Sequence, residues 1–500
     1  MRDRSRRWTH ALPIRARTLV VAGLLIVSSI AWAQDSPSTT TPRLRSGQAT
    51  QPSRTWRLDF YQTGGPGIEA YSADRLVVEP LPWPDNRAND VEQQLTGNYR
   101  YEVIDATGRV IFARGYDPAF AEWLTTAEPK QLRRTFSESL RFPALTSKAE
   151  IVLKKRDPEG DYKEVWRYPV DPADVFIDRA TPARQTVIEL EKHGDPTTKV
   201  DLLLLGDGYT AAECGRTFRA HARRAIDALF ALEPFKSRRD AFNVWGLCPP
   251  AAQSGVASPS RGIYRRTPSG AAYDAFGSER YILTFENRAW RDIAAWAPYE
   301  YVTILTNGDI YGGGGLYNVY STAAAANDFA AYLFVHEFAH HFAGLADEYY
   351  TSPVAYEPPD HIVEPWAPNA SATADSARVK WRDLLAPGIP TPTPWPKEQF
   401  EAMSKEFQSR RARIRAEKRP ESEMTALFRE ELEAMTKLLS SAEHHGQVGI
   451  FQGANYDAKA FYRPQVDCIM FTRNKVPFCR VCQRALAAVI DRHAPRTPSH

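Results

Sequence analysis

The sequence has no marked surplus of charge of either sign. It holds 63 lysines and arginines against 60 aspartates and glutamates, which gives a formal net charge of +3 over 500 residues. The two signs are interspersed along the chain, so the protein has no large basic field that would attract the phosphates of a nucleic acid. We therefore expect no nucleic acid among its partners.

The N-terminal region lacks an apolar run long enough to cross a bilayer comfortably. Arg2, Arg4, Arg6 and Arg7 lie near the start of the chain, ahead of the apolar run from Leu19 to Ile30, which is shorter than the roughly 20 residues of a membrane-spanning helix. Ala31-Trp32-Ala33 follows, as at the cleavage site of a secretory signal peptide. We predict a signal peptide over residues 1–33, no stable membrane insertion after its cleavage, and a periplasmic or secreted location. An uncleaved membrane anchor is the alternative.

Apolar residues are nearly absent from residues 34–54. This stretch is rich in Ser, Thr, Pro and Gln, and it cannot bury enough surface to offset the entropy lost on ordering it. We predict that it is a disordered linker.

Residues 55–180 lack any grouping of side chains with an obvious catalytic use. Apolar and polar residues alternate in short runs, and turn formers such as Gly64-Gly65-Pro66 separate the runs. A period of two is typical of strands with one buried face, so we predict an N-terminal β-rich domain folded as an antiparallel β-sandwich. The predicted strands are Thr55–Tyr61, Asn98–Ile104, Val110–Arg114, Glu150–Lys155 and Glu164–Tyr168.

A second domain is predicted over residues 185–490. The apolar run from Val200 to Leu205 leads through a glycine-containing turn into a helical pattern near Glu213, the order of an α/β unit. The turn lacks the lysine and the glycine spacing of a phosphate-binding loop, so we expect no nucleotide there. Further strands are predicted over Phe242–Leu247 and Tyr301–Thr306.

The stretch from His336 to Glu348 carries the strongest chemical signal. His336 and His340 are four residues apart, so on a helix their imidazoles lie on one face and can bind one Zn²⁺. In this HExxH pattern Glu337 does not bind the metal but takes a proton from the zinc-bound water. Ordinary core or surface histidines on a helix are the alternative interpretation.

A catalytic zinc site needs a third protein ligand. Gly344 is suited to end the helix, because glycine adopts a left-handed conformation at little cost, and the chain can then turn back toward the metal. Asp347 is the predicted third ligand. Glu348 is the alternative, in which case Asp347 would orient a histidine.

Four consecutive glycines precede the predicted zinc helix. They carry no side chains that would obstruct another backbone, so this segment is a candidate substrate-binding strand that pairs with an extended peptide. A flexible surface loop is the alternative. The four residues are Gly312, Gly313, Gly314 and Gly315.

Residues 387–447 differ in composition from their surroundings. They are rich in proline at first and then densely charged, with helical patterns over Glu398–Arg415 and Glu421–Ser440. We predict a charged helical insertion in the second domain. A solvated hairpin is the default interpretation, and a lid or a second substrate-binding surface is the alternative.

Cysteine is rare, with five residues in the chain. In an exported protein this number favours disulfides, with one thiol left over or paired outside the chain. Cys468 is predicted to pair with Cys479 or Cys482, and Cys214 with Cys248. A metal cluster of Cys468, Cys479 and Cys482 is the alternative, although the sequence offers no clear fourth ligand.

Several ordered motifs together resemble the IgA peptidase family of secreted bacterial zinc metallopeptidases. They are LLGDGYT at 204–210, FNVW at 242–245, YGGGG at 311–315, HEFAHHFAGLADEY at 336–349 and YRPxxDCIM at 462–470. The resemblance extends over roughly residues 187–486. It implies a metzincin-like catalytic domain behind an N-terminal β-rich domain, with His336 and His340 as ligands, Glu337 as base and Met470 in a methionine turn. The usual metzincin pattern places a glycine three residues after the second histidine and a histidine three further on, whereas here Gly344 comes four after His340 and Asp347 takes the last place.

The predicted fold class is therefore α+β, with a β-sandwich followed by a metzincin-like α/β domain. The predicted function is that of a secreted zinc endopeptidase that hydrolyses peptide bonds in extracellular proteins, with host or extracellular glycoproteins as candidate substrates. Candidate donors to the oxyanion are Tyr349, Tyr456 and Tyr462. The alternative is a secreted glycoprotein-binding protein without catalysis, whose structural zinc would need a closed site of four protein ligands.

Overall fold

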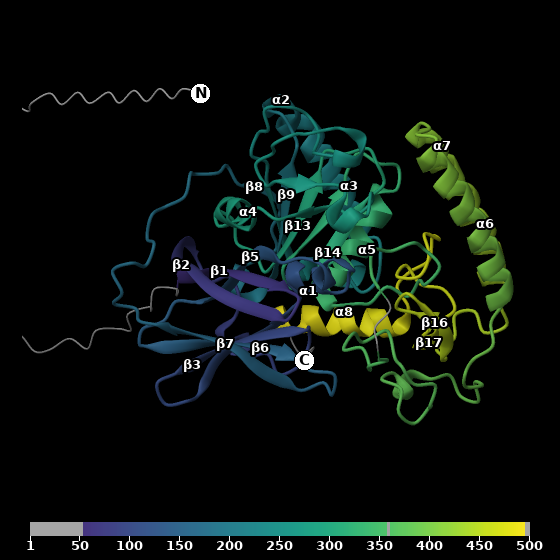
Figure 1. Cartoon of the computed structure of the whole chain (residues 1–500), viewed down its shortest axis with the longest axis horizontal. Coiled ribbons are helices and arrows are strands. Elements are labelled where there is room, and N and C mark those ends of the chain that lie inside the picture. The colour runs from purple at the N-terminus through teal and green to yellow at the C-terminus, as the bar shows by residue number, and fades with distance from the viewer. Residues whose placement is uncertain (1–53, 358–360, 496–500) are drawn as a thin grey trace, which may run out of the picture. The chain divides into compact units, whose positions relative to one another are not determined.

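The computed structural model describes residues 54–357 and 361–495 of the chain. The predicted signal peptide and residues 34–53 of the predicted linker lie outside this part, and the last predicted linker residue, Arg54, begins the first strand. The fold is mixed α+β, with several antiparallel sheets and, among the described residues, eight α-helices (Figure 1). From Arg54 onward the described residues form one compact unit.

Two antiparallel sheets form the N-terminal part of the fold, with strand orders β2-β1-β5 and β4-β3-β6-β7. Each of the five strands predicted here overlaps an observed strand, so their existence is confirmed. The strands are β1 (Arg54–Gly65), β2 (Ile68–Pro82), β3 (Tyr99–Asp105), β4 (Val110–Tyr116), β5 (Arg134–Pro143), β6 (Ala149–Arg156) and β7 (Tyr162–Val170).

The alternating pattern does not predict β2, β5 or the short helix α1 (Ala119–Leu124). Charged and polar side chains are buried in this region, including Glu138 and Ser139 of β5. In β1 the buried Arg57 Nε donates to Asp59 Oδ1 at 2.8 Å. Because inward-facing positions hold polar residues, the apolar alternation that marks a strand is lost there.

Side chains of the two N-terminal sheets contact each other. Phe60 of β1 stacks on Trp166 of β7 with ring centroids 5.3 Å apart. Gln62 Nε2 of β1 donates to the Tyr99 hydroxyl of β3 at 3.2 Å. The two sheets therefore share buried residues of one core.

A mixed sheet of six strands, in the order β14-β15-β13-β9-β10-β8, forms the centre of the remaining chain. Its four inner strands are parallel, and β14 and β8 are antiparallel edges. The residues of β9, β10 and β13 are all buried, which explains their mainly apolar sequences and confirms the three predicted strands. The strands are β8 (Ile188–Glu191), β9 (Val200–Asp207), β10 (Phe242–Leu247), β13 (Tyr301–Thr306), β14 (Gly313–Leu316) and β15 (Tyr320–Ala324), and a separate pair is β11 (Ala271–Ala272) with β12 (Leu283–Thr284).

Helix α5 (Ala330–Ala343) carries the HExxH motif and packs on β14, β15 and α3. Its apolar residues, among them Leu333 and Phe338, are buried against these elements, as the sequence pattern predicts. This packing fixes the motif at the β14 edge of the sheet. The other helices here are α2 (Ala211–Glu213), α3 (Arg219–Leu229), α4 (Asn287–Ala294) and α8 (Arg480–His493).

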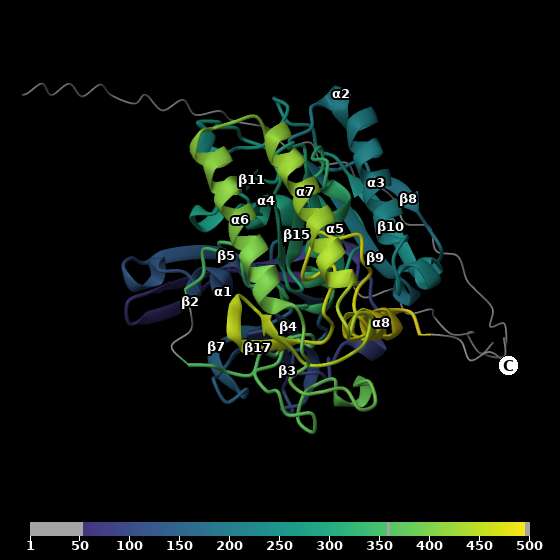
Figure 2. The same cartoon turned by 90° about the vertical axis from the view of Figure 1, so that its right-hand side faces the viewer.

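The predicted helical insertion is a hairpin of α6 (Lys397–Ala416) and α7 (Glu421–Ser440), which run side by side (Figure 2). Arg410 Nη1 donates to Glu430 Oε1 at 2.6 Å between the two helices. A hairpin of β16 (Phe451–Ala454) and β17 (Asp457–Arg463) follows. Among the described residues, no helix is both long enough and apolar enough to cross a membrane.

Candidate active site

Helix α5 places His336 and His340 one turn apart, with their Nε2 atoms 3.2 Å from each other. The helix ends at Gly344, whose φ of 60° is left-handed and whose N–H donates to the His340 carbonyl at 3.0 Å. This ending is the one that the sequence predicts. It allows the following residues to return to the histidines.

Asp347 returns to both histidines. Its Oδ1 lies 2.9 Å from His336 Nε2 and 3.3 Å from His340 Nε2. The two nitrogens and the carboxylate oxygen all lie within 4.8 Å of one another. The three residues predicted as zinc ligands are therefore brought together.

The hydrogen bonds behind the rings indicate which nitrogen of each histidine carries a proton. His336 Nδ1 lies 3.0 Å from the carbonyl of Ile469, and His340 Nδ1 lies 2.5 Å from the carbonyl of Leu345. A carbonyl only accepts, so each Nδ1 is the donor and each neutral ring presents a bare Nε2. Two lone pairs and a carboxylate thus converge on one point, a donor set that fits a divalent metal such as zinc.

The Asp347 carboxylate favours a positive charge at this point. Burial opposes ionisation of Asp347, but the two histidines hold the pKa of its carboxyl well below its usual range. Burial would lower the pKa of His340, yet the Asp347 carboxylate raises it to about 9. In the metal-free protein a proton therefore sits on this group near neutral pH, and a bound metal ion would replace it.

Glu337 points from the same helix into the cleft that the ligands face. Its side chain is half-buried and lies against β14, where an added Cβ on Gly313 would come within 2.8 Å of Glu337 Cγ. Burial raises the pKa of the Glu337 carboxyl, although the two histidines oppose this. A raised pKa suits a carboxylate that accepts a proton and later returns it.

Of the predicted substrate-binding glycines, Gly313, Gly314 and Gly315 begin β14 and Gly312 directly precedes it; Gly312, Gly313 and Gly315 line the cleft. A Cβ on Gly315 would lie 2.4 Å from the Glu337 carbonyl oxygen and 2.7 Å from His340 Cβ. At Gly313, the edge of β14 that faces away from β15 already has backbone partners. The Gly313 N–H donates to Arg280 O at 3.0 Å, and its carbonyl accepts from Ile282 N at 3.1 Å. Close packing on α5 is thus one physical reason for glycine here, and peptide pairing remains a prediction.

The cleft has a volume of about 970 Å³. Its floor is α5 with Asp347, one wall comes from the N-terminal part with Glu122 and Lys155, and another from the helical insertion with Leu432 and Met435. The insertion therefore contributes to the cleft wall and is not only a solvated hairpin.

The three candidate oxyanion tyrosines occupy different places. The Tyr456 hydroxyl donates to Asp347 Oδ2, and its backbone N–H donates to the Tyr349 carbonyl at 3.1 Å. Tyr349 lines the cleft with its hydroxyl 3.4 Å from Arg280 Nη2. Tyr462 is not among the described residues that line the cleft, and its backbone pairs with Ser371.

Met470 is fully buried, and its carbonyl accepts the Glu348 N–H at 2.9 Å. The Glu348 side chain is not directed at the histidines: its Oε1 lies 3.4 Å from Cys482 Sγ.

The predicted Cys214–Cys248 disulfide is present. The predicted pairing of Cys468 with Cys479 or Cys482 is wrong for this structure, where all three are free thiols.

Sequence reasoning missed several residues that shape the site, above all Arg280 and the carbonyls of Leu345 and Ile469. A backbone carbonyl leaves no trace in residue identity. Arg280 is one of 63 basic residues, so it gives no local signal.

Comparison with protein families agrees with this geometry. The family described as IgA Peptidase M64 matches residues 188–490, and the Peptidase M64 N-terminus matches residues 48–167. The chain belongs to the M64 peptidase family. Membership makes it a peptidase, a hydrolase with protein or peptide substrates, and confirms the family that the ordered motifs predict. No curated protein matches this M64 peptidase.

Proposed function

We propose that this M64 peptidase is an exported, zinc-dependent endopeptidase of extracellular proteins. The observation that carries the proposal is the arrangement on α5, where Glu337 faces the same cleft as the His336, His340 and Asp347 group. These three residues would hold the ion. Glu337 lies beside them with no ligand role in the group, as expected for a base.

A zinc ion bound there would supply Lewis acidity toward the scissile carbonyl. Glu337 would accept the proton of the attacking water as the carbon–oxygen bond forms, and would then deliver this proton to the leaving amine as the carbon–nitrogen bond breaks. Burial of the Glu337 carboxyl, which raises its pKa, favours both transfers. Tyr349 lines the cleft beside Arg280, and its hydroxyl is the proposed donor to the developing oxyanion.

The size and walls of the cleft support internal cleavage. A volume of about 970 Å³, with walls from three separate parts of the chain, accommodates several residues of an extended peptide. We propose that the peptide lies along β14 near Gly315 and that the α6–α7 hairpin contacts residues away from the scissile bond. Host or extracellular glycoproteins are the proposed substrate class.

The boundaries and types of the domains are part of the same proposal. We propose a signal peptide (1–33), a linker (34–54), a sandwich-like N-terminal domain (55–180) and a metzincin-like catalytic domain (185–490) with the insertion at 387–447. Supporting observations are the antiparallel edge strand β14 beside the HExxH helix and the buried Met470, whose carbonyl accepts from the N–H of the residue after Asp347.

Removal and return of the metal tests this function. A chelator should abolish cleavage of an unfolded protein substrate, and Zn²⁺ added in slight excess should restore it, whereas Mg²⁺ should not. Cleavage that persists after the ion is shown to be gone would exclude a zinc peptidase. A closed structural site, as a pure binding protein would need, is less well supported, because the group at His336 contains three members in the described part of the chain.

A further inference from the structure

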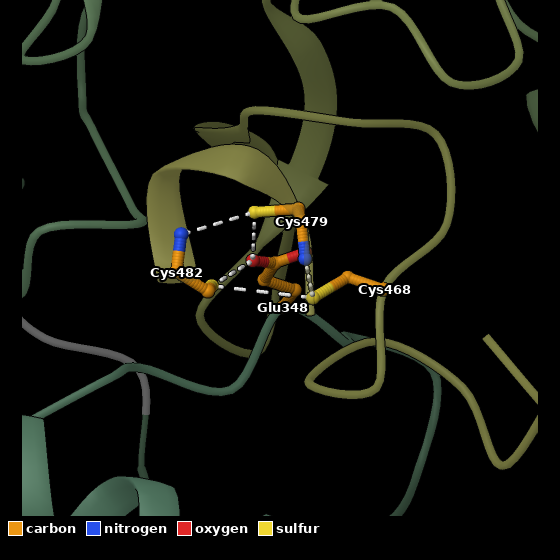
Figure 3. Close-up of side chains that lie close together, drawn as sticks. All are labelled: Glu348, Cys468, Cys479 and Cys482. Atoms are coloured by element: carbon orange, nitrogen blue, oxygen red, sulfur yellow. Dashed lines mark hydrogen bonds between the residues drawn. The ribbon is translucent and has the colours of Figure 1, made fainter. Parts of the chain in front are cut away.

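Apart from the candidate active site, three thiols and one carboxylate converge in the core (Figure 3). Glu348, Cys468, Cys479 and Cys482 are all buried, and one ligand atom from each lies within 4.8 Å of the others. Cys482 Sγ lies 3.4 Å from Glu348 Oε1 and 4.0 Å from Cys468 Sγ. Cys479 Sγ lies 3.9 Å from the same Glu348 oxygen.

These separations match a tetrahedral zinc site. Bond lengths of about 2.3 Å to sulfur and about 2.1 Å to oxygen place two sulfurs about 3.8 Å apart and a sulfur and an oxygen about 3.6 Å apart. A disulfide would instead need two sulfurs at about 2.05 Å. It would use one pair only and leave the third thiol beside Glu348.

Glu348 is the residue that points to a cation. Its side chain is fully buried, and Oε1 accepts from Asn369 Nδ2 at 3.0 Å. Its other oxygen, Oε2, has no hydrogen-bond partner among the described residues. A buried carboxylate with one unpaired oxygen is destabilising, and a metal ion bound at this carboxylate would offset the cost.

The backbone around the cysteines is arranged for thiolates. Cys479 caps the N-terminus of α8, and the Cys482 N–H donates to Cys479 Sγ at 3.4 Å. The Cys479 N–H donates to Cys468 Sγ at 3.2 Å. N–H donors and a helix N-terminus both favour the anionic form of sulfur. The Arg463 guanidinium is buried close to Glu348 and Cys468 and would offset part of their negative charge once a bound metal ion keeps them ionised.

We propose that Cys468, Cys479, Cys482 and Glu348 bind a structural zinc ion, distinct from the ion proposed at His336. Binding would release the three thiol protons to solvent, form three Zn–S bonds and one Zn–O bond, and leave the sulfur oxidation state unchanged. Three thiolates with no open position for water indicate a structural role.

The second ion would also hold the first site in place. Asp347 precedes Glu348 in the chain, and the Ile469 carbonyl that contacts His336 follows Cys468 directly. The ion would therefore link the loop after Gly344, the loop with Met470 and the start of α8. This inference does not depend on cleavage and goes beyond the proposed function.

The test is the zinc content of the protein purified without chelator or reductant. We expect about two zinc ions per chain in the wild type and about one in the His336→Ala/His340→Ala variant. X-ray absorption of this variant should show a shell of about three sulfurs at about 2.3 Å. Replacing Cys479 and Cys482 by Ser should remove the sulfur-bound ion, whereas replacing Cys214 and Cys248 by Ser, the matched control, should leave the zinc content unchanged.

Two results would overturn the inference. One is a His336→Ala/His340→Ala protein without zinc, or with zinc bound by nitrogen and oxygen only. The other is a disulfide among the three cysteines in the intact wild-type protein, detected by peptide mapping under non-reducing conditions. Neither measurement uses activity, so a failure here is distinguishable from a failure of the proposed peptidase mechanism.

Discussion

Asp347 and Glu348 are neighbours in the chain, but their carboxylates face different groups. Asp347 Oδ1 lies 2.9 Å from His336 Nε2, whereas Glu348 Oε1 lies 3.4 Å from Cys482 Sγ. The backbone at this dipeptide is held from both sides, because the Glu348 N–H donates to Met470 O and the Asp347 carbonyl accepts from Asn455 N, each at 2.9 Å. One short segment thus joins the candidate catalytic group to the cysteine cluster.

Asp347→Asn should weaken metal binding at the histidines. The variant keeps the shape of the side chain but loses the charge that both rings face, so we expect zinc affinity to fall by roughly 100-fold or more, and activity at limiting zinc with it. Competition with a chelator of known affinity measures this. Asp161→Asn, at a side chain that is 75% exposed, is the control and should change nothing. Equal affinity in the two variants would exclude Asp347 as a ligand.

Tyr456→Phe and Tyr349→Phe should have different effects. Tyr456 donates to Asp347, so its loss should lower zinc affinity by about 10-fold to 100-fold, with activity recovered when zinc is saturating. The loss of the hydroxyl of Tyr349, which lines the cleft beside Arg280, should lower kcat by about 10²-fold even when zinc is saturating. Steady-state kinetics with and without added zinc separates the two. A Tyr349→Phe enzyme with wild-type kcat would remove this residue from the mechanism.

Gly315→Ala should destabilise the protein. The new methyl group would meet the Glu337 carbonyl oxygen at 2.4 Å, and we expect a loss of at least about 2 kcal/mol in the free energy of unfolding, together with lower zinc affinity. Gly215→Ala is the matched control, because a Cβ there meets nothing within 4 Å. It should leave stability unchanged or raise it by up to about 1 kcal/mol. Denaturant unfolding of both variants measures the difference, and equal stabilities would contradict the close packing of β14 on α5.

Glu138 should make the fold less stable as pH rises. In the folded protein, burial raises the pKa of the Glu138 carboxyl to about 8, although the Arg291 charge opposes this. In an unfolded chain the pKa of a glutamate is about 4.3. Between these values the folded protein keeps a proton that the unfolded chain releases, so stability falls by up to about 1.4 kcal/mol per pH unit.

The Glu138→Gln variant tests this pH dependence. The amide keeps the shape of the side chain and cannot ionise, so the loss of stability between about pH 5.5 and about pH 7.5 should be smaller than in the wild type. Glu150→Gln, at a side chain that is 47% exposed, should behave like the wild type. Identical slopes in all three proteins would show that Glu138 is ionised in the folded state.

Local patterns in the sequence predict the helix of the candidate site but not its surroundings. The spacing of His336 and His340 and the position of Gly344 lie within one helix and its end, so the 3.6-residue period and glycine geometry suffice. The role of Glu348 could not be predicted, because its partner Cys482 is 134 residues away. Sequence alone therefore offered Glu348 as a ligand beside the histidines and left the cysteines without a fourth ligand.

The fold shows the same division between local and distant information. Fully buried strands such as β9 are mainly apolar and are predictable. Strand β5 is not, because Glu138 and Ser139, on opposite faces of the strand, are both buried and find polar partners on other elements: Glu138 accepts from Phe120 N at 3.4 Å, and Ser139 accepts from Asn287 Nδ2 at 2.6 Å. A buried polar residue is explained only by its partner, and the partner lies elsewhere in the chain.

The most direct test of the proposed mechanism compares Glu337→Gln with the wild type on an unfolded protein substrate, with zinc content measured on the same samples. The variant should keep its zinc, and its kcat/KM should fall by about 10²-fold to 10⁴-fold. Glu406→Gln, at a side chain that is 70% exposed and is not among the described residues that line the cleft, should retain wild-type activity. A Glu337→Gln protein that holds zinc and cleaves at the wild-type rate would contradict the account.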